Sequence, residues 1–114
     1  MAKIAFWITA GPELEAKAVA GLRLAERLKT GRHADVEVFL YGPGLHLTTS
    51  PSPAIQEALG ALKQAAVAMG ACPVNVKTMG LEDDVVAAAG VQLRRRAVDA
   101  LLELVEQGYQ IIGI

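Results

Sequence analysis

The side chain best suited to take part in a reaction is that of the only cysteine in this sequence, Cys72, in the stretch ACPVNVKTMG. An uncharged run, 65–71, leads into it and Pro73 follows. Proline suits the first turn of a helix, which would leave Cys72 near the N-cap, where unpaired backbone N–H groups favour a thiolate. A free cysteine is also among the most buried residue types and often acts only as a small apolar side chain. Position and neighbours alone leave both interpretations open.

Several other side chains are candidates for a supporting role at such a thiol. Lys77 follows five residues later and could add a positive charge, although this spacing does not place it on the same helical face as Cys72. His46, in YGPGLHL, could act as an acid, a base or a hydrogen-bond donor, or could be only the polar tip of a packed loop. Thr9 and Tyr41 are candidates because their loops should converge on the cysteine.

Apolar segments of strand length alternate with helical patterns along the chain, and these elements must position the candidate residues. Continuous apolar strands are typical of a parallel sheet that is buried on both faces. The segments that we interpret as strands are 3–10, 36–41, 65–71, a brief one at 90–93, and 109–114. The helices are expected at 12–31, 53–64 and 95–107, with a short turn or helix through 73–80 and an acidic helix start at Glu82, Asp83 and Asp84.

Strands and helices in this order predict an α/β fold, with a mostly parallel sheet of about five strands and helices on both faces. In the first helix, an apolar stripe contains Leu14, Ala18, Leu22, Ala25 and Leu28, and Gly31 is expected to end it. The last helix aligns Val98, Leu101, Leu102 and Val105. Ligands of such sheets bind at the carboxyl ends of the strands. That rule selects the loops 9–13, 42–49 and 72–77.

Length and composition narrow the class of protein. The 114 residues favour a single domain, 1–114, and 11 basic against 12 acidic residues do not predict a nucleic-acid-binding surface. The run Arg94–Arg96 is interpreted as solvated surface or an oligomer contact. A single cysteine rules out an intramolecular disulfide, which fits a reducing compartment. No apolar run reaches the roughly 18 residues of a membrane helix. We therefore expect a cytoplasmic protein.

Bound cofactors and metals are not expected. One cysteine and two histidines at no recognisable spacing do not make a zinc site, and the sequence contains neither a GxGxxG nor a Walker loop. Self-association is expected, because a small domain so rich in aliphatic residues has difficulty burying all its apolar surface.

The order of these segments resembles the DsrE/DsrF-like (YchN-like) family of small sulfur-relay proteins. The matching stretches are KIAFWITAGPELEAKAVAGLRLA, VEVFLYGPGLHL, ACPVNVKTMGL and GYQIIGI. In the third, a strand-end cysteine is followed after eight residues by Gly80-Leu81, and Asn75 is the first polar residue after Cys72. The resemblance implies a three-layer α/β/α sandwich, assembly into trimers or hexamers, and a cysteine that carries sulfur as a persulfide, here Cys72.

The leading hypothesis is therefore a sulfur-relay or sulfurtransferase-like protein. Cys72 would exchange sulfane sulfur with donor and acceptor proteins or small sulfane-sulfur compounds, supported by Lys77, His46 and Asn75. One alternative is a non-catalytic module of the same fold that binds a small ligand or partner between its loops. Another is a thiol peroxidase, in which a resolving thiol would have to come from another subunit or molecule.

Overall fold

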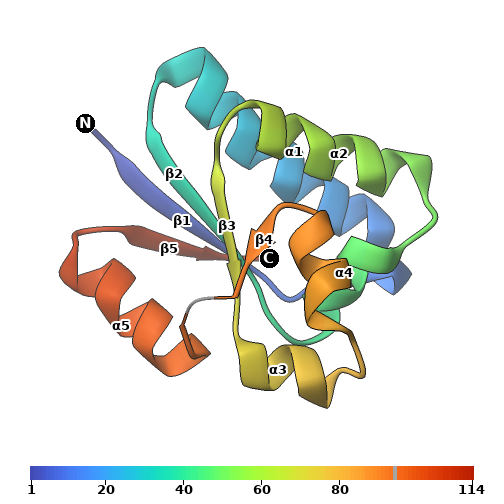
Figure 1. Cartoon of the computed structure of the whole chain (residues 1–114). Coiled ribbons are helices and arrows are strands. Elements are labelled where there is room, and N and C mark those ends of the chain that lie inside the picture. Colours follow the sequence, from blue (N-terminus) through green and yellow to red (C-terminus); the bar gives the residue numbers. More distant parts are fainter. Residues whose placement is uncertain (94) are drawn as a thin grey trace.

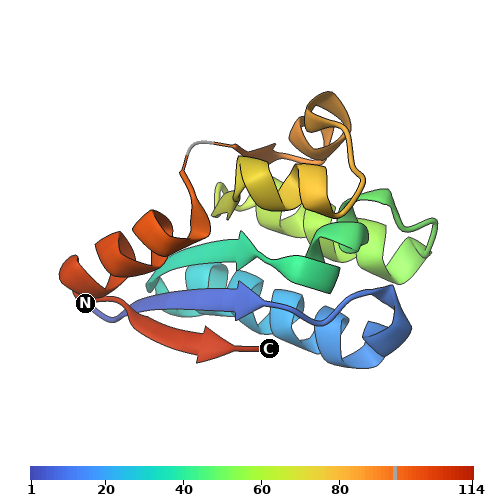
Figure 2. The same ribbon diagram turned by 90° about the horizontal axis from the view of Figure 1, so that it is seen from below.

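In the part of the chain that the structure describes, the sheet has five strands, and all of them run parallel. The structure is a computed structural model that describes residues 1–93 and 95–114. Its strands are β1 (Lys3–Ile8), β2 (Asp35–Leu40), β3 (Ala68–Ala71), β4 (Val91–Gln92) and β5 (Gln110–Gly113), in the spatial order β4-β3-β2-β1-β5. Figure 2 shows β1, β2 and β5 side by side and pointing the same way. The predicted parallel sheet is confirmed, and the brief 90–93 segment supplies its short edge strand.

Helices cover both faces of the sheet, as predicted for an α/β fold. α1 (Glu15–Arg32) and α2 (Pro53–Gln64) lie together on one face, and α5 (Ala97–Glu106) lies on the other (Figure 1). The remaining helical segments are η1 (Pro12–Leu14), η2 (Gly42–Thr49), α3 (Pro73–Thr78) and α4 (Asp83–Ala88). Glu82 is the N-cap of α4 and two aspartates occupy its first turn, as the acidic run predicts.

The main core lies between the sheet and α1 and α2. Ala18, Leu22 and Ala25 of the predicted stripe are buried there, facing alternate residues of β1, β2 and β3. Leu14 is half exposed instead, because α1 begins only at Glu15 and Leu14 is its N-cap. The prediction that Gly31 ends this helix is also wrong. The helix continues to Arg32, and the chain reverses at His33, which has a left-handed φ of 56°.

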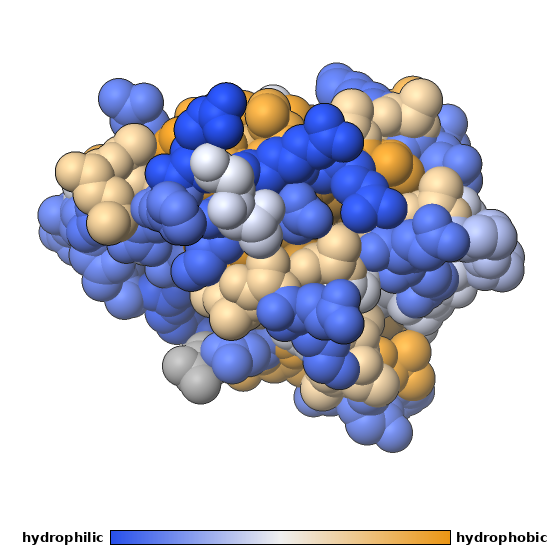
Figure 3. Space-filling model, turned by 90° about the horizontal axis from the view of Figure 1, so that it is seen from above, coloured by the Kyte–Doolittle hydropathy of each residue, from blue (hydrophilic) through white to orange (hydrophobic). Residues whose placement is uncertain are grey.

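The buried face of α5 is not the one with the aligned aliphatic residues. Ala100 and Leu104 face the sheet and are buried, whereas Val98, Leu101, Leu102 and Val105 are exposed. Apolar residues extend over two adjacent faces of this helix, and periodicity alone does not say which one meets the sheet. We call the four exposed residues the α5 stripe. Figure 3 shows the face of the molecule seen from above the view of Figure 1. Hydrophilic side chains predominate on it, and apolar side chains lie in small groups.

The Gly- and Pro-rich segment after β2, interpreted from sequence as a loop, forms the 3-10 helix η2, and its Leu45 and Leu47 are fully buried. Gly44 makes this packing possible. A Cβ at position 44 would run into the backbone carbonyl of Ile8, so η2 lies directly on the end of β1.

Within the described ranges, no helix has the length and apolarity to cross a membrane.

Candidate functional site

Cys72 stands at the junction between β3 and α3. β3 ends at Ala71, Pro73 occupies the first turn of α3, and Cys72 is the N-cap residue with extended backbone (φ −80°, ψ 125°). The local position predicted for this cysteine is therefore confirmed. Because β3 is flanked by β2 and β4, the thiol lies at the carboxyl end of an interior strand, where parallel sheets hold their ligands.

The Cys72 side chain is packed against α5 and the sheet. Only 6% of the residue is exposed, and it forms a small cluster with Phe39 and Ala100, against which Ala97 and Trp7 also pack. Trp7 and Phe39 stack with ring centroids 4.4 Å apart. The Phe39 ring has room because its neighbour on β3 is glycine: a Cβ at position 70 would lie 3.2 Å from the ring.

The pKa of the Cys72 thiol is nevertheless lowered. Burial alone raises the pKa, but the backbone N–H groups of Asn75, Ala97 and Val74, together with the positive charge of Arg96, outweigh it. Since the thiol makes no capping hydrogen bond within α3, we attribute the effect to N–H dipoles that act near the sulfur as partial positive charges. Two helices contribute these dipoles: α3, which begins in the cysteine's own loop, and α5, which lies on the face of the sheet where the thiol packs.

The cysteine loop is joined to the segment that follows β2. The backbone N–H of Gly42 donates a hydrogen bond to Asn75 Oδ1 over 2.8 Å. Beside Gly42, Tyr41 is partly exposed, and its ring centroid lies 5.8 Å from that of Trp7. The structure therefore brings two of the sequence-predicted residues, Asn75 and Tyr41, to the surroundings of Cys72.

The other candidate side chains lie elsewhere or have other partners. Thr9 Oγ1 donates to the Ile114 carbonyl over 2.8 Å, which fastens the end of β1 to the chain after β5. His46 is half-buried in η2, and Lys77 is exposed on α3. Among the described residues, no hydrogen bond or ion pair joins these three side chains to the thiol.

Sequence reasoning missed the groups that α5 contributes to the site. It placed Arg96 in a surface run and gave Ala97 no role, yet both act on the thiol. Arg94, the first residue of that run, lies outside the described residues. The arginine run is visible in the sequence. Its position near Cys72 is not, because it depends on how the chain crosses from β4, at the sheet edge, to α5 on the face opposite α1.

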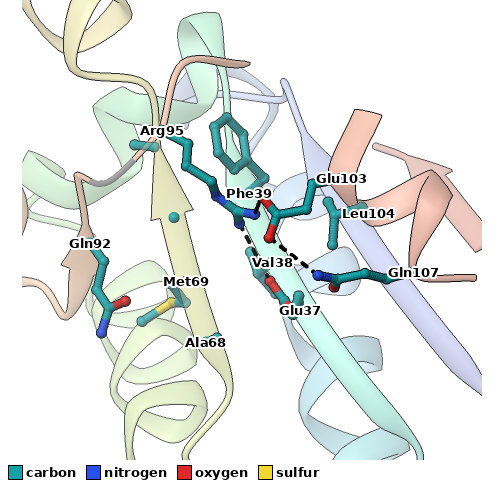
Figure 4. Close-up of a pocket in the computed structure, with 12 residues that line it drawn as sticks. Glu37, Val38, Phe39, Ala68, Met69, Gln92, Arg95, Glu103, Leu104 and Gln107 are labelled. Carbon is teal, nitrogen blue, oxygen red and sulfur yellow. Dashed lines mark hydrogen bonds and ion pairs between the residues drawn. The ribbon is translucent and has the colours of Figure 1, made fainter. Parts of the chain in front are cut away.

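A groove of about 360 Å³ lies on the same face of the sheet, between α5 and β4. Its floor includes Ala68 of β3, with only a methyl group, and Gly70, with no side chain, so little covers the sheet there. Charged side chains cross it: Arg95 reaches toward Glu103 on α5 and Glu37 on β2 (Figure 4). In the described part of the chain, no group of three or more His, Cys, Asp or Glu residues is arranged to hold a metal ion.

Solved structures with the same fold come from bacteria and an archaeon. The ychN protein from E. coli matches with a TM-score of 0.79 and 18% identity over 100% of both chains. A protein of unknown function from Methanobacterium thermoautotrophicum matches with a TM-score of 0.77 and 17% identity over 100% of both chains. A conserved protein of unknown function from Bacteroides thetaiotaomicron matches with a TM-score of 0.77 and 15% identity, over 96% of this chain and 94% of that one.

These identities are low and establish the fold alone. No curated protein matches the sequence. The model of the DsrE/DsrF-like family, in contrast, matches residues 2–113. That match extends over the whole sheet and the cysteine loop, as the resemblance in the sequence predicts, and the chain belongs to the DsrE/DsrF-like family.

Proposed function

We propose that this protein is a sulfur-relay protein that carries sulfane sulfur as a persulfide on Cys72. The observation that carries the proposal is the placement of a buried thiol at the N-terminal ends of two helices, with a lowered pKa. Thiolates are the attacking species in sulfur exchange, so groups that favour the ionised form favour the reaction. Family membership supports the same class of function.

The transfer needs no external oxidant. The Cys72 thiolate attacks the outer sulfur of a donor persulfide, R–S–SH. A new S–S bond forms at Cys72, the S–S bond of the donor breaks, and the donor leaves as the thiolate R–S⁻. In the second transfer, an acceptor thiolate attacks the outer sulfur, and Cys72 leaves as a thiolate. The N–H groups of Asn75, Ala97 and Val74 stabilise Cys72 whenever it carries negative charge, as nucleophile and as leaving group.

The donor and acceptor are either proteins with reactive thiols or small sulfane-sulfur compounds. We further propose that the protein works as a homo-oligomer, a trimer or hexamer, in a reducing cytoplasm. The α5 stripe supports self-association, because four large apolar side chains on one helix are exposed to solvent.

Intact mass spectrometry of the folded protein tests the proposal directly. After incubation with sodium polysulfide, we expect the wild-type chain to gain about 32 Da, one sulfur atom, and to return to its original mass with a reductant. Cys72→Ser is the matched control and should gain nothing, since the chain has no other cysteine. A wild-type thiol that remains unmodified and resists alkylation until the protein unfolds would contradict the proposal.

The same mass measurement, repeated with hydrogen peroxide in place of polysulfide, separates the alternatives. A thiol peroxidase would consume peroxide and take up oxygen at Cys72, with a second thiol from another molecule to resolve the product. A binding module would leave Cys72 unreactive with both reagents, and the groove between α5 and β4 would then become the first place to look for a ligand.

A further inference from the structure

The connection between β4 and α5 brings three consecutive residues, 95–97, across the sheet toward Cys72. β4 ends at Gln92, on the edge of the sheet, and α5 begins at Ala97 on the face where the thiol packs. The main-chain N–H of Ala97 and the charge of Arg96 both act on Cys72. The position of this connection over β3 therefore decides how much of their positive potential reaches the sulfur.

Among the described residues, the apolar contacts at the start of α5 lie on one side of the helix. Ala97 and Ala100 contact the cluster of Phe39 and Cys72, but both are small side chains. Along its length α5 also lies close to β5, two strands beyond β2. Toward β4 the helix faces the open groove, where Ala68 and Gly70 of β3 offer little side chain to pack against. The N-terminal end of α5 is therefore lightly packed on the side of the groove.

Arg95 spans that side. Its Nη1 lies 2.7 Å from Glu103 Oε2, and its Nη2 lies 4.0 Å from Glu37 Oε1 (Figure 4). Glu103 belongs to α5 and also accepts a hydrogen bond from Gln107 Nε2 over 3.2 Å. Glu37 rises from the middle of β2, between Ala5 of β1 and Ala68 of β3. One guanidinium thus ties the connection both to its own helix and to the sheet.

We infer that Arg95 is a positioning residue that holds the N-terminal end of α5 over Cys72. It does not touch the reacting sulfur, and its own charge is not one of those that act on the thiol. It acts through Ala97 and Arg96, which follow it in the chain. The inference deepens the proposed function, on which its biological meaning rests, but it concerns the ionisation of the thiol and can be measured without any sulfur transfer.

The competing interpretation is an ordinary surface ion pair. Arg95 and Glu37 are about a third or less exposed and Glu103 about half, and exposed pairs contribute little to stability. Such a pair would affect the free energy of unfolding slightly and the thiol pKa not at all. The thiol pKa is therefore the readout that separates a positioning role from a merely structural one.

The experiment is a pH titration of the Cys72 thiolate in the folded protein, by ultraviolet absorbance and by the rate of iodoacetamide alkylation. The single cysteine makes the signal unambiguous. Arg95→Gln should raise the thiol pKa and reduce the thiolate fraction at neutral pH by about three- to tenfold, a pKa change of roughly half a unit to one unit. Arg95→Lys, which retains a cation of similar reach, should restore part of the difference.

Two further variants complete the design. Glu103→Gln removes the closer partner of Arg95 and should shift the thiol pKa in the same direction, which provides a second route if Arg95→Gln fails to fold. Arg27→Gln, at an exposed position of α1 on the other face, removes the same charge far from the groove and should leave the titration unchanged.

An Arg95→Gln protein with the wild-type thiol pKa would overturn the inference, whatever its stability. So would an equal shift in Arg27→Gln, because the effect would then reflect net charge alone. The proposed function fails differently: a wild-type thiol that ionises readily but never gains sulfur would refute the relay and leave the role of Arg95 intact.

Discussion

Replacing Gly44 with alanine should destabilise the protein strongly, because this position has no room for a side chain. A Cβ there would lie against the carbonyl oxygen and carbon of Ile8 and near the Cα of Thr9, all main-chain atoms of the β1 end. A flexible neighbour could rotate away, but a backbone cannot. Relief requires η2 to move off β1, and Leu45 and Leu47, both fully buried, would move with it.

The magnitude follows from the kinds of contact involved. Overpacking a tight site costs about 1–3 kcal/mol, and the rigid main-chain neighbours place Gly44→Ala at the upper end, about 3 kcal/mol. For a domain of this size, that corresponds to a melting temperature lower by roughly 10 °C. Gly60→Ala is the matched control. Position 60 lies in α2 with nothing near its Cβ, so alanine should stabilise the protein by about 0.5–1 kcal/mol through helix propensity.

The assay is urea unfolding followed by circular dichroism, with the slope of the transition checked for two-state behaviour. Amide exchange at Gly42 adds a local readout, since its N–H is bonded to Asn75 and should exchange faster if η2 is displaced. If Gly44→Ala unfolds within about 0.5 kcal/mol of the wild type and the Gly42 amide stays protected, then η2 does not depend on this close approach and the reasoning is wrong.

Three further predictions concern ionisation and assembly. The pKa of Cys72 is lowered in the folded state. Its ionisation therefore stabilises the fold fully above the ordinary thiol pKa, about 8.5, and this contribution is lost as pH falls through the folded value. The difference in free energy of unfolding between wild type and Cys72→Ser should grow with pH. Burial and the hydrogen bond to Asp35 raise the pKa of Tyr109. Tyr109→Phe should lower the free energy of unfolding by about 1 kcal/mol at neutral pH, measured by urea unfolding. The variant should also lack the loss of stability that wild type shows above pH ~10. Leu102→Glu should dissociate any oligomer seen by light scattering, and an unchanged mass would exclude the α5 stripe as the interface.

The sheet and the position of Cys72 could be predicted because local signals determine them. Uncharged apolar runs mark strands that are buried on both faces, and proline after the cysteine marks the start of a helix. Burial of the first-helix stripe also followed from periodicity, apart from Leu14 at the boundary. These features depend on residues that are close together in the chain.

The surroundings of the thiol could not be predicted in the same way. Ala97 and Arg96 reach Cys72 only because α5 crosses to the face opposite α1, and no local pattern encodes that crossing. The orientation of α5 had the same difficulty. Its apolar residues cover two faces, and the side that meets the sheet is decided by Ala100 and Leu104 packing on Phe39 and Ala5.

The two interpretations of Cys72 that the sequence leaves open are compatible in the structure. Phe39, Ala97 and Ala100 fill the space around the sulfur and leave only 6% of the residue exposed, so the thiol does pack as a small apolar group. Burial would keep it protonated, and the N–H groups from α3 and α5 reverse that effect. On the proposed function, this arrangement suits a carrier. A persulfide would extend about 2 Å beyond Sγ, and the side chains packed around Sγ would shield its inner sulfur.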